Sequence, residues 1–181
     1  MPPYDPKSIA NYFIERAAAE KKLLTPLQII KLVYIAHGWH LGLRNAPLIN
    51  EAPQAWKYGP VIPSLYHSLK AFGNEGVSGP VTAFRQADGD WIVDLREVTV
   101  PPPDDPAIRG FLKSVWTAYG HLSGLQLSAL THASNTPWQK AWHLKGAKYS
   151  KGFKIPEDDI REHYALLRER SDAGSSKSAA V

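Results

Sequence analysis

The chain has 181 residues, of which 21 are basic and 17 are acidic, and it contains no cysteine. This length fits one domain with a continuous core, and the lack of cysteine excludes disulfides, thiolate metal sites and a cysteine nucleophile. A net charge of +4 permits contact with nucleic acid or with an acidic protein surface, but the two signs are interspersed, so the charge does not choose between these partners.

The sequence gives no sign of export or of a membrane anchor. Residues 1–6 lack the positive start and the apolar run of a secretory signal, and no stretch approaches the ~20 apolar residues that span a bilayer. We therefore expect a cytoplasmic protein that makes no membrane contact.

Two helices are predicted in the first quarter of the chain. The second begins at a capping box: Thr25 can cap the helix, Pro26 needs no N–H at the first position, and Gln28 can reach back to the cap. Apolar residues lie on nearly every side of this helix, as they do in a helix at the centre of a fold. The first helix begins at Asp5 and Pro6, and its apolar stripe consists of Ile9, Tyr12, Phe13 and Ala17.

The middle of the chain changes from helical to strand periodicity. Pro63 begins a short helix that ends near Gly73. Val81–Phe84 and Trp91–Leu95 are then predicted as the two strands of a hairpin whose turn is Asp88-Gly89-Asp90.

The remainder of the chain is predicted to be helical up to a short tail. Capping boxes at Ser123 and Thr136 begin two helices, and a last helix extends from about Pro156 to Arg170. Residues 171–181 are rich in serine, alanine and glycine and cannot bury enough apolar area to become ordered. Before these, the proline run at 101–106 leads to a helix whose apolar face is Ile108, Leu112, Val115 and Tyr119.

Together these elements predict a mainly α (α+β) fold. It is a compact helical domain around the buried central helix, with a small antiparallel β-ribbon as an insertion. One domain covers residues 1–170, and residues 171–181 form a flexible C-terminal tail. The proline run is an internal connector, because neither side of it has a complete core alone.

The most informative segment places aromatic groups, a cation and a turn next to one another. Trp56 and Tyr58 can stack on a partner while Lys57 pairs with an acidic group, and Gly59 and Pro60 would fix the turn. The alternative is that both aromatic residues belong to the core and the turn merely leads into the next helix.

Several polar residues within the helices have both a functional and a structural interpretation. Lys31 interrupts the central helix, either as a recognition cation or as a side chain that reaches water from the first turn. His37 and His40 lack further metal ligands nearby, so we predict no metal site and no cofactor. Ser128 and His132 can share a helix face, but no acid orients the ring and no oxyanion hole is evident, so we predict that the protein is not an enzyme.

His132 is better explained by a structural corner with Pro137 and Trp138. In this corner the imidazole would bond a helix end, and the indole would pack on the central helix. The free end Ala179-Ala180-Val181 is a flexible tail that an AAA+ unfoldase could grip, although most alanine-rich tails are simply disordered.

The segment Lys140–Lys154 contains five lysines, no acidic residue and three aromatic side chains. Cations that alternate with rings suit single-stranded nucleic acid, and they suit an acidic protein partner equally well. A solvated loop is the structural alternative. The lysines that would make these contacts are Lys145, Lys148, Lys151 and Lys154.

Three runs, in this order and spacing, resemble the SocA-like antitoxin domain, also called Panacea, over roughly residues 5–145. They are Leu27–Tyr34, Ala55–Pro63 and Leu127–His132, the last followed by Pro137 and Trp138. The resemblance implies a bacterial, type II-like antitoxin that neutralises a separately encoded toxin by direct protein contact.

The resemblance also implies partners and a mechanism. The antitoxin would be a proteolytic adaptor that brings the toxin to the Clp protease (ClpXP); the alternatives are sequestration alone and a nucleic-acid-binding regulator that uses Lys140–Lys154. Ala179, Ala180 and Val181 would contact the protease. The toxin would be bound by Lys31, Trp56, Lys57, Tyr58, Gly59, Pro60, His132 and Trp138.

Overall fold

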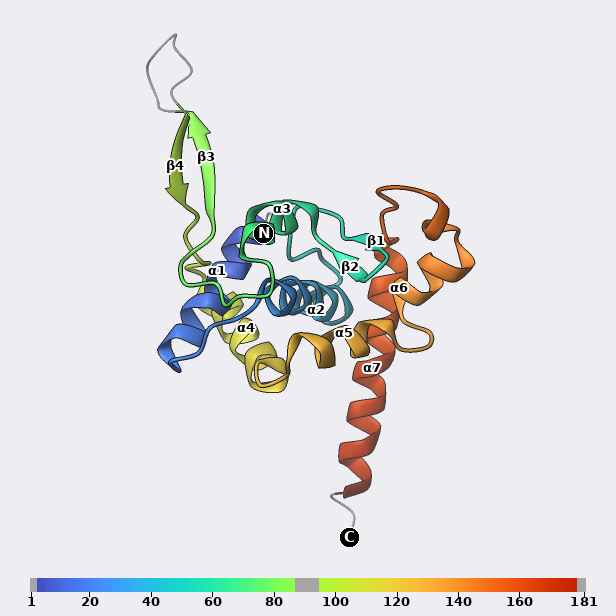
Figure 1. The fold of residues 1–181 in the computed structure, drawn as a ribbon. Coiled ribbons are helices and arrows are strands. Elements are labelled where there is room, and N and C mark those ends of the chain that lie inside the picture. The colour runs from blue at the N-terminus through green and yellow to red at the C-terminus, as the bar shows by residue number, and fades with distance from the viewer. Residues whose placement is uncertain (1–2, 87–94, 179–181) are drawn as a thin grey trace.

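The computed structural model describes residues 3–86 and 95–178. Figure 1 shows helices gathered around α2, with the β3–β4 ribbon projecting from one side of the body and α7 from another. The elements confirm the predicted mainly α (α+β) class. In chain order they are α1 (Pro6–Ala19), α2 (Pro26–Arg44), β1 (Gln54–Trp56), β2 (Gly59–Val61), α3 (Pro63–Leu69), β3 (Thr82–Gln86), β4 (Leu95–Thr99), α4 (Pro106–Tyr119), α5 (Gly124–His132), α6 (Pro137–Gln139) and α7 (Glu157–Ser178).

Helix α2 is the buried centre that the sequence predicts. The Thr25 hydroxyl accepts from the Gln28 N–H, and the Gln28 side chain accepts from the Thr25 N–H, so the capping box forms in full. Every residue from Ile29 to Gly38 is buried. A Cβ at Gly38 would lie 2.1 Å from Cε2 of Tyr164, so the glycine lets α7 pack directly against α2.

The two later capping boxes differ. At Ser123 both reciprocal hydrogen bonds form, as predicted. At Thr136 only one of the two bonds of the box is present, in which the Thr136 hydroxyl accepts from the Gln139 N–H. Helix α6 is short and continues directly into a π-helical turn over Lys140–Leu144, which the sequence did not predict.

The β3–β4 ribbon is antiparallel, and Phe84 is opposite Glu97. Among the described residues the second strand covers Leu95–Thr99, and Leu95 pairs with Gln86. The rest of the predicted strand Trp91–Leu95 lies outside the described residues. The predicted turn Asp88-Gly89-Asp90 lies outside the described residues.

The base of the ribbon is tied to α1 by one buried side chain. Asn11 Nδ2 donates to the carbonyls of Val81 and Val100 at 2.8 and 2.6 Å, and its Oδ1 accepts from the Val81 N–H at 2.6 Å. Both legs of the ribbon are therefore fixed to the same point of the helical body.

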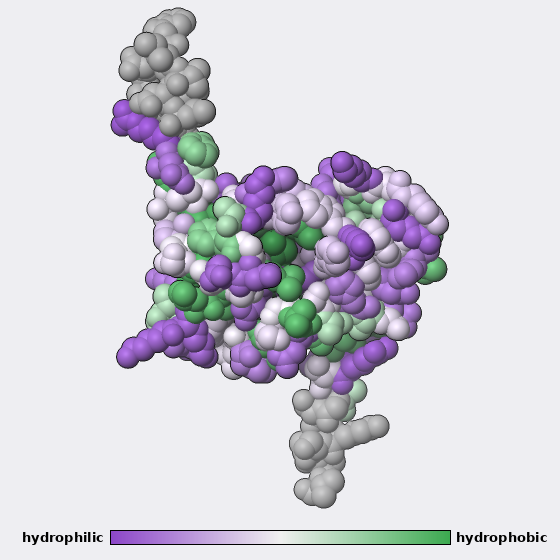
Figure 2. All heavy atoms as spheres, in the orientation of Figure 1, coloured by the Kyte–Doolittle hydropathy of each residue, from purple (hydrophilic) through white to green (hydrophobic). Residues whose placement is uncertain are grey.

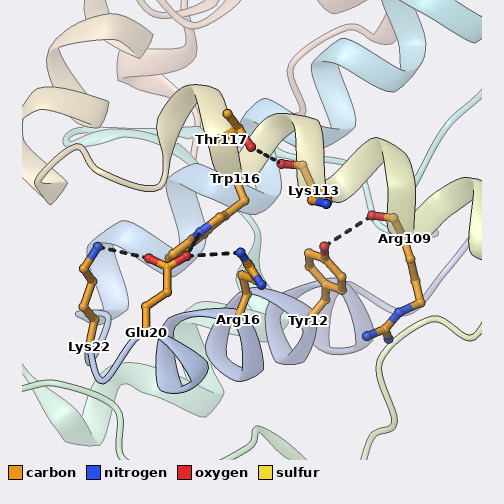
Figure 3. Close-up of polar contacts among 8 residues, drawn as sticks. All are labelled: Tyr12, Arg16, Glu20, Lys22, Arg109, Lys113, Trp116 and Thr117. Carbon is orange, nitrogen blue, oxygen red and sulfur yellow. Dashed lines mark hydrogen bonds and ion pairs between the residues drawn. The ribbon is translucent and has the colours of Figure 1, made fainter.

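Polar contacts join α1 to α4, as Figure 3 shows. The indole N–H of Trp116 donates to Glu20 at 2.8 Å, and this bond lowers the pKa of the Glu20 carboxyl. The Tyr12 hydroxyl donates to the Arg109 carbonyl at 3.3 Å. Helix α4 also presents the predicted face, because Ile108, Leu112 and Val115 are buried.

Helix α7 extends farther than the sequence predicts. It continues to Ser178 instead of ending at Arg170, and Arg168 and Asp172 form an ion pair of 3.7 Å one turn apart. Part of the segment predicted as a tail is therefore helical. Ala179, Ala180 and Val181 lie outside the described residues.

Candidate functional site

The segment around Lys57 is a β-hairpin, whereas the sequence predicts only a turn. Strands β1 and β2 are antiparallel, with Trp56 opposite Gly59, so Lys57 and Tyr58 occupy the turn. The outer edge of β1 is also held, because the Ala55 N–H donates to the Phe153 carbonyl at 2.8 Å. A chain segment that is distant in sequence thus fixes one side of the hairpin.

Lys31 of α2 contacts the backbone of the hairpin on its buried side. Its side chain is 0% exposed, and Nζ donates to the carbonyls of Tyr58 and Pro60 at 3.1 and 3.2 Å. Burial lowers the pKa of Lys31 to about 7. Of the two interpretations of Lys31, the one in which its side chain reaches water is therefore wrong, because the hairpin covers this part of α2.

Gly59 makes this arrangement possible. Its φ is +104°, a backbone conformation that residues with a side chain rarely adopt. A Cβ at this position would lie 2.2 Å from Lys31 Nζ and 2.7 Å from His132 Cε1. Only a glycine lets the amine and the imidazole approach the strand so closely.

His132 and Trp138 complete the support behind the hairpin. The imidazole Nδ1 lies 2.6 Å from the Ser128 carbonyl, and the ring lies 4.1 Å from that of Trp138. The Trp138 indole N–H donates to the Trp56 carbonyl at 2.8 Å. Burial lowers the pKa of His132, with a smaller contribution from Lys31, while the bond to Ser128 opposes the shift. The ring therefore acts as a packing element at the predicted corner.

The outer face of the hairpin carries Trp56, Lys57 and Tyr58, whereas Pro60 is buried. Tyr58 is 73% exposed, and Lys57 Nζ lies 5.4 Å from the centre of its ring. Trp56 is half-buried and meets Tyr66 of α3 edge to face, with ring centres 4.8 Å apart. Tyr66 was not predicted to belong to this site, although it follows the hairpin closely in the sequence.

Two hollows flank the hairpin. The α3 groove has a volume of about 600 Å³ and lies between α2, the hairpin and α3; the basic cleft has a volume of about 870 Å³ and lies between the hairpin and residues 142–152. Trp56 and Lys57 line both hollows. Figure 2 shows apolar residues near the centre of the visible face, surrounded by hydrophilic ones.

The four lysines predicted as a group separate in the structure. Lys148 and Lys151 line the basic cleft, together with Trp142 and Tyr149. Lys145 instead pairs with Asp159 at 2.6 Å, and Lys154 is exposed but does not line the cleft. Only the fold could show this division, because the π-helical turn and the following loop set the direction of each side chain.

The histidines of the central helix have structural roles. His37 Nδ1 accepts from the Leu48 N–H at 3.3 Å, and burial lowers its pKa to about 4. His40 Nδ1 lies 2.7 Å from the Ala46 carbonyl. Within residues 3–86 and 95–178, no group of three or more His, Asp or Glu side chains is placed to hold a metal ion. In the same ranges no helix is both long and apolar enough to cross a membrane.

The β1–β2 hairpin and the residues that support it, Lys31, His132 and Trp138, lie within residues 29–139, which match the family described as "Antitoxin SocA-like, Panacea domain". The match covers more than half of the chain, so the protein belongs to this antitoxin family. A relative is "Antitoxin SocA" of Caulobacter vibrioides (strain NA1000 / CB15N), which is 31% identical over 164 residues, 91% of this chain and 84% of the relative. No solved structure matches the chain.

Proposed function

We propose that this protein neutralises a cognate toxin by binding it directly through the β1–β2 hairpin. The observation that carries the proposal is an exposed aromatic and cationic turn on a rigid support. Tyr58 and Lys57 are exposed, while Lys31, bonded to the Tyr58 and Pro60 carbonyls, holds the backbone beneath them. A side chain that is already positioned loses little conformational freedom on binding, which favours affinity.

Of the predicted toxin-binding residues, this proposal assigns direct contact to Trp56, Lys57 and Tyr58. The buried members of the set, which include Lys31 and Trp138, would act by positioning these three. Neutralisation then follows from mass action, since free toxin falls as the complex forms.

The proposed mechanism needs no catalytic residue in this chain. Ser128 Oγ lies 3.3 Å from His132 Nδ1, but the same nitrogen is 2.6 Å from the Ser128 carbonyl. An Nδ1–H that donates to this carbonyl cannot also remove the serine proton. This supports a protein that acts by binding and not as an enzyme.

The proposal extends to the fate of the toxin. As family resemblance implies, the chain would deliver the toxin in the cytoplasm to the Clp protease, where tethering raises the local concentration and speeds degradation. Sequestration alone is the alternative. Affinity capture from cells with active and inactive protease distinguishes them: a toxin enriched only without protease activity supports delivery, and equal enrichment refutes it.

Direct binding is tested by Tyr58→Ala, with Phe84→Ala as a matched control. Both side chains are more than two thirds exposed, at 73% and 71%, but Phe84 lies on the ribbon. We expect Tyr58→Ala to weaken toxin binding by about 2 kcal/mol, measured by calorimetry, without a change in melting temperature. Normal binding by Tyr58→Ala combined with a loss in Phe84→Ala would instead place the contact on the ribbon.

A further inference from the structure

The two hollows beside the hairpin are neighbours, because Trp56 and Lys57 line both. We infer that the toxin docks here through an acidic segment with apolar side chains, which crosses the hairpin turn and enters both the α3 groove and the basic cleft. This inference rests on the proposed toxin binding and specifies the chemistry of the partner.

The charge of the surface indicates an acidic partner. Lys57, Lys148 and Lys151 line the basic cleft, Lys57 and Lys70 line the α3 groove, and neither lining contains an aspartate or glutamate. Among the described residues, none of these four lysines forms an ion pair, whereas Lys145 is neutralised by Asp159. Four cations without an acidic partner among the described residues thus line the two hollows, and one of them, Lys57, lines both.

The α3 groove indicates that the acidic partner also carries apolar side chains. Its walls include aliphatic residues from α2 and β2 and the rings of Trp56 and Tyr66. A groove of this kind stabilises apolar groups by removing them from water. The aliphatic lining residues are Pro26, Leu27, Ile30 and Val61.

The arrangement of the rings favours a polypeptide over single-stranded nucleic acid. Lys148 lies over the Tyr149 ring at 4.8 Å, and Lys57 lies over the Tyr58 ring at 5.4 Å. Trp142 is stacked on Trp138, with an angle of 13° between the rings. Each of these rings has one face occupied within the protein, so fewer faces are open to bases, whose binding depends on stacking.

A zero-length carbodiimide, which joins carboxylates to amines that touch them, tests the inference on the purified complex of full-length protein and captured toxin. We expect cross-links from toxin aspartate or glutamate to the lysines of the two hollows. The double variant Lys148→Ala with Lys151→Ala should weaken binding about tenfold, and more at low salt than at high salt. A control that removes two exposed lysines that line neither hollow, Lys22→Ala with Lys113→Ala, should change affinity less than about twofold.

The outcomes separate this inference from the proposed function. A stable complex with cross-links at other lysines and equal affinity for both double variants would overturn the acidic segment and leave toxin binding intact. Failure to form any complex would overturn both. A single-stranded DNA of about 12 nucleotides that binds the parent but not the Lys148 and Lys151 variant would replace the peptide with nucleic acid as occupant.

Discussion

Substituting Lys31 by methionine tests the buried amine that supports the hairpin. Methionine is unbranched and apolar, so Lys31→Met retains much of the packing while it removes the charge and the donor. The carbonyls of Tyr58 and Pro60 lose their bonds of 3.1 and 3.2 Å to Nζ. Each unpaired carbonyl costs about 1–3 kcal/mol at every pH, and this cost is offset by removing a buried cation.

The amine also produces a pH-dependent difference whose sign follows from its pKa. Burial lowers the pKa of Lys31 from 10.5 in the unfolded chain to about 7 in the folded one. Below pH 7 the amine is protonated in both states, so its burial destabilises the fold by a constant amount. Between these two pKa values the unfolded chain binds more protons, and stability rises by about 2 kcal/mol from pH 7 to pH 9.

The assay is urea unfolding of the parent and Lys31→Met at pH values from about 6 to 9.5. Other titrating groups, including the buried histidines and tyrosines, are present in both proteins and cancel in the difference. We expect the parent to gain stability relative to the variant as pH rises through this range. A difference that stays constant would refute the reasoning, because it would mean that the two carbonyls keep the amine protonated throughout.

Two further substitutions test the support of the hairpin. Gly59→Ala should lower the free energy of unfolding by about 3 kcal/mol in the same urea assay, because the added Cβ strains the backbone and displaces Lys31. The control is Gly79→Ala, since no atom lies within 4 Å of a Cβ added at Gly79. Trp138→Phe keeps an aromatic ring but loses the bond to the Trp56 carbonyl, and should cost about 1–2 kcal/mol by thermal unfolding. An unchanged melting temperature would show that this bond contributes nothing.

The structure confirms several of the sequence predictions that depend on local patterns. The capping residues Thr25 and Ser123 begin helices as predicted, because the hydroxyl and the glutamine that form each box are three residues apart. The burial of α2 was also predicted, since apolar residues on every side can be covered only by neighbouring elements. The first ribbon strand was predicted to end at Phe84 but continues to Gln86, because short β-prone runs do not fix the ends of a strand.

Sequence by itself determined the helical class, the central helix and the family motifs, because these reside in residues close together in the chain. Tertiary structure alone decided that Lys31 is buried, since Nζ bonds carbonyls that lie 27 and 29 residues away in the hairpin. It also brought Lys148 and Lys151 beside Lys57 and left Lys145 paired with Asp159. These outcomes depend on the packing of distant segments, which no local pattern of residues records.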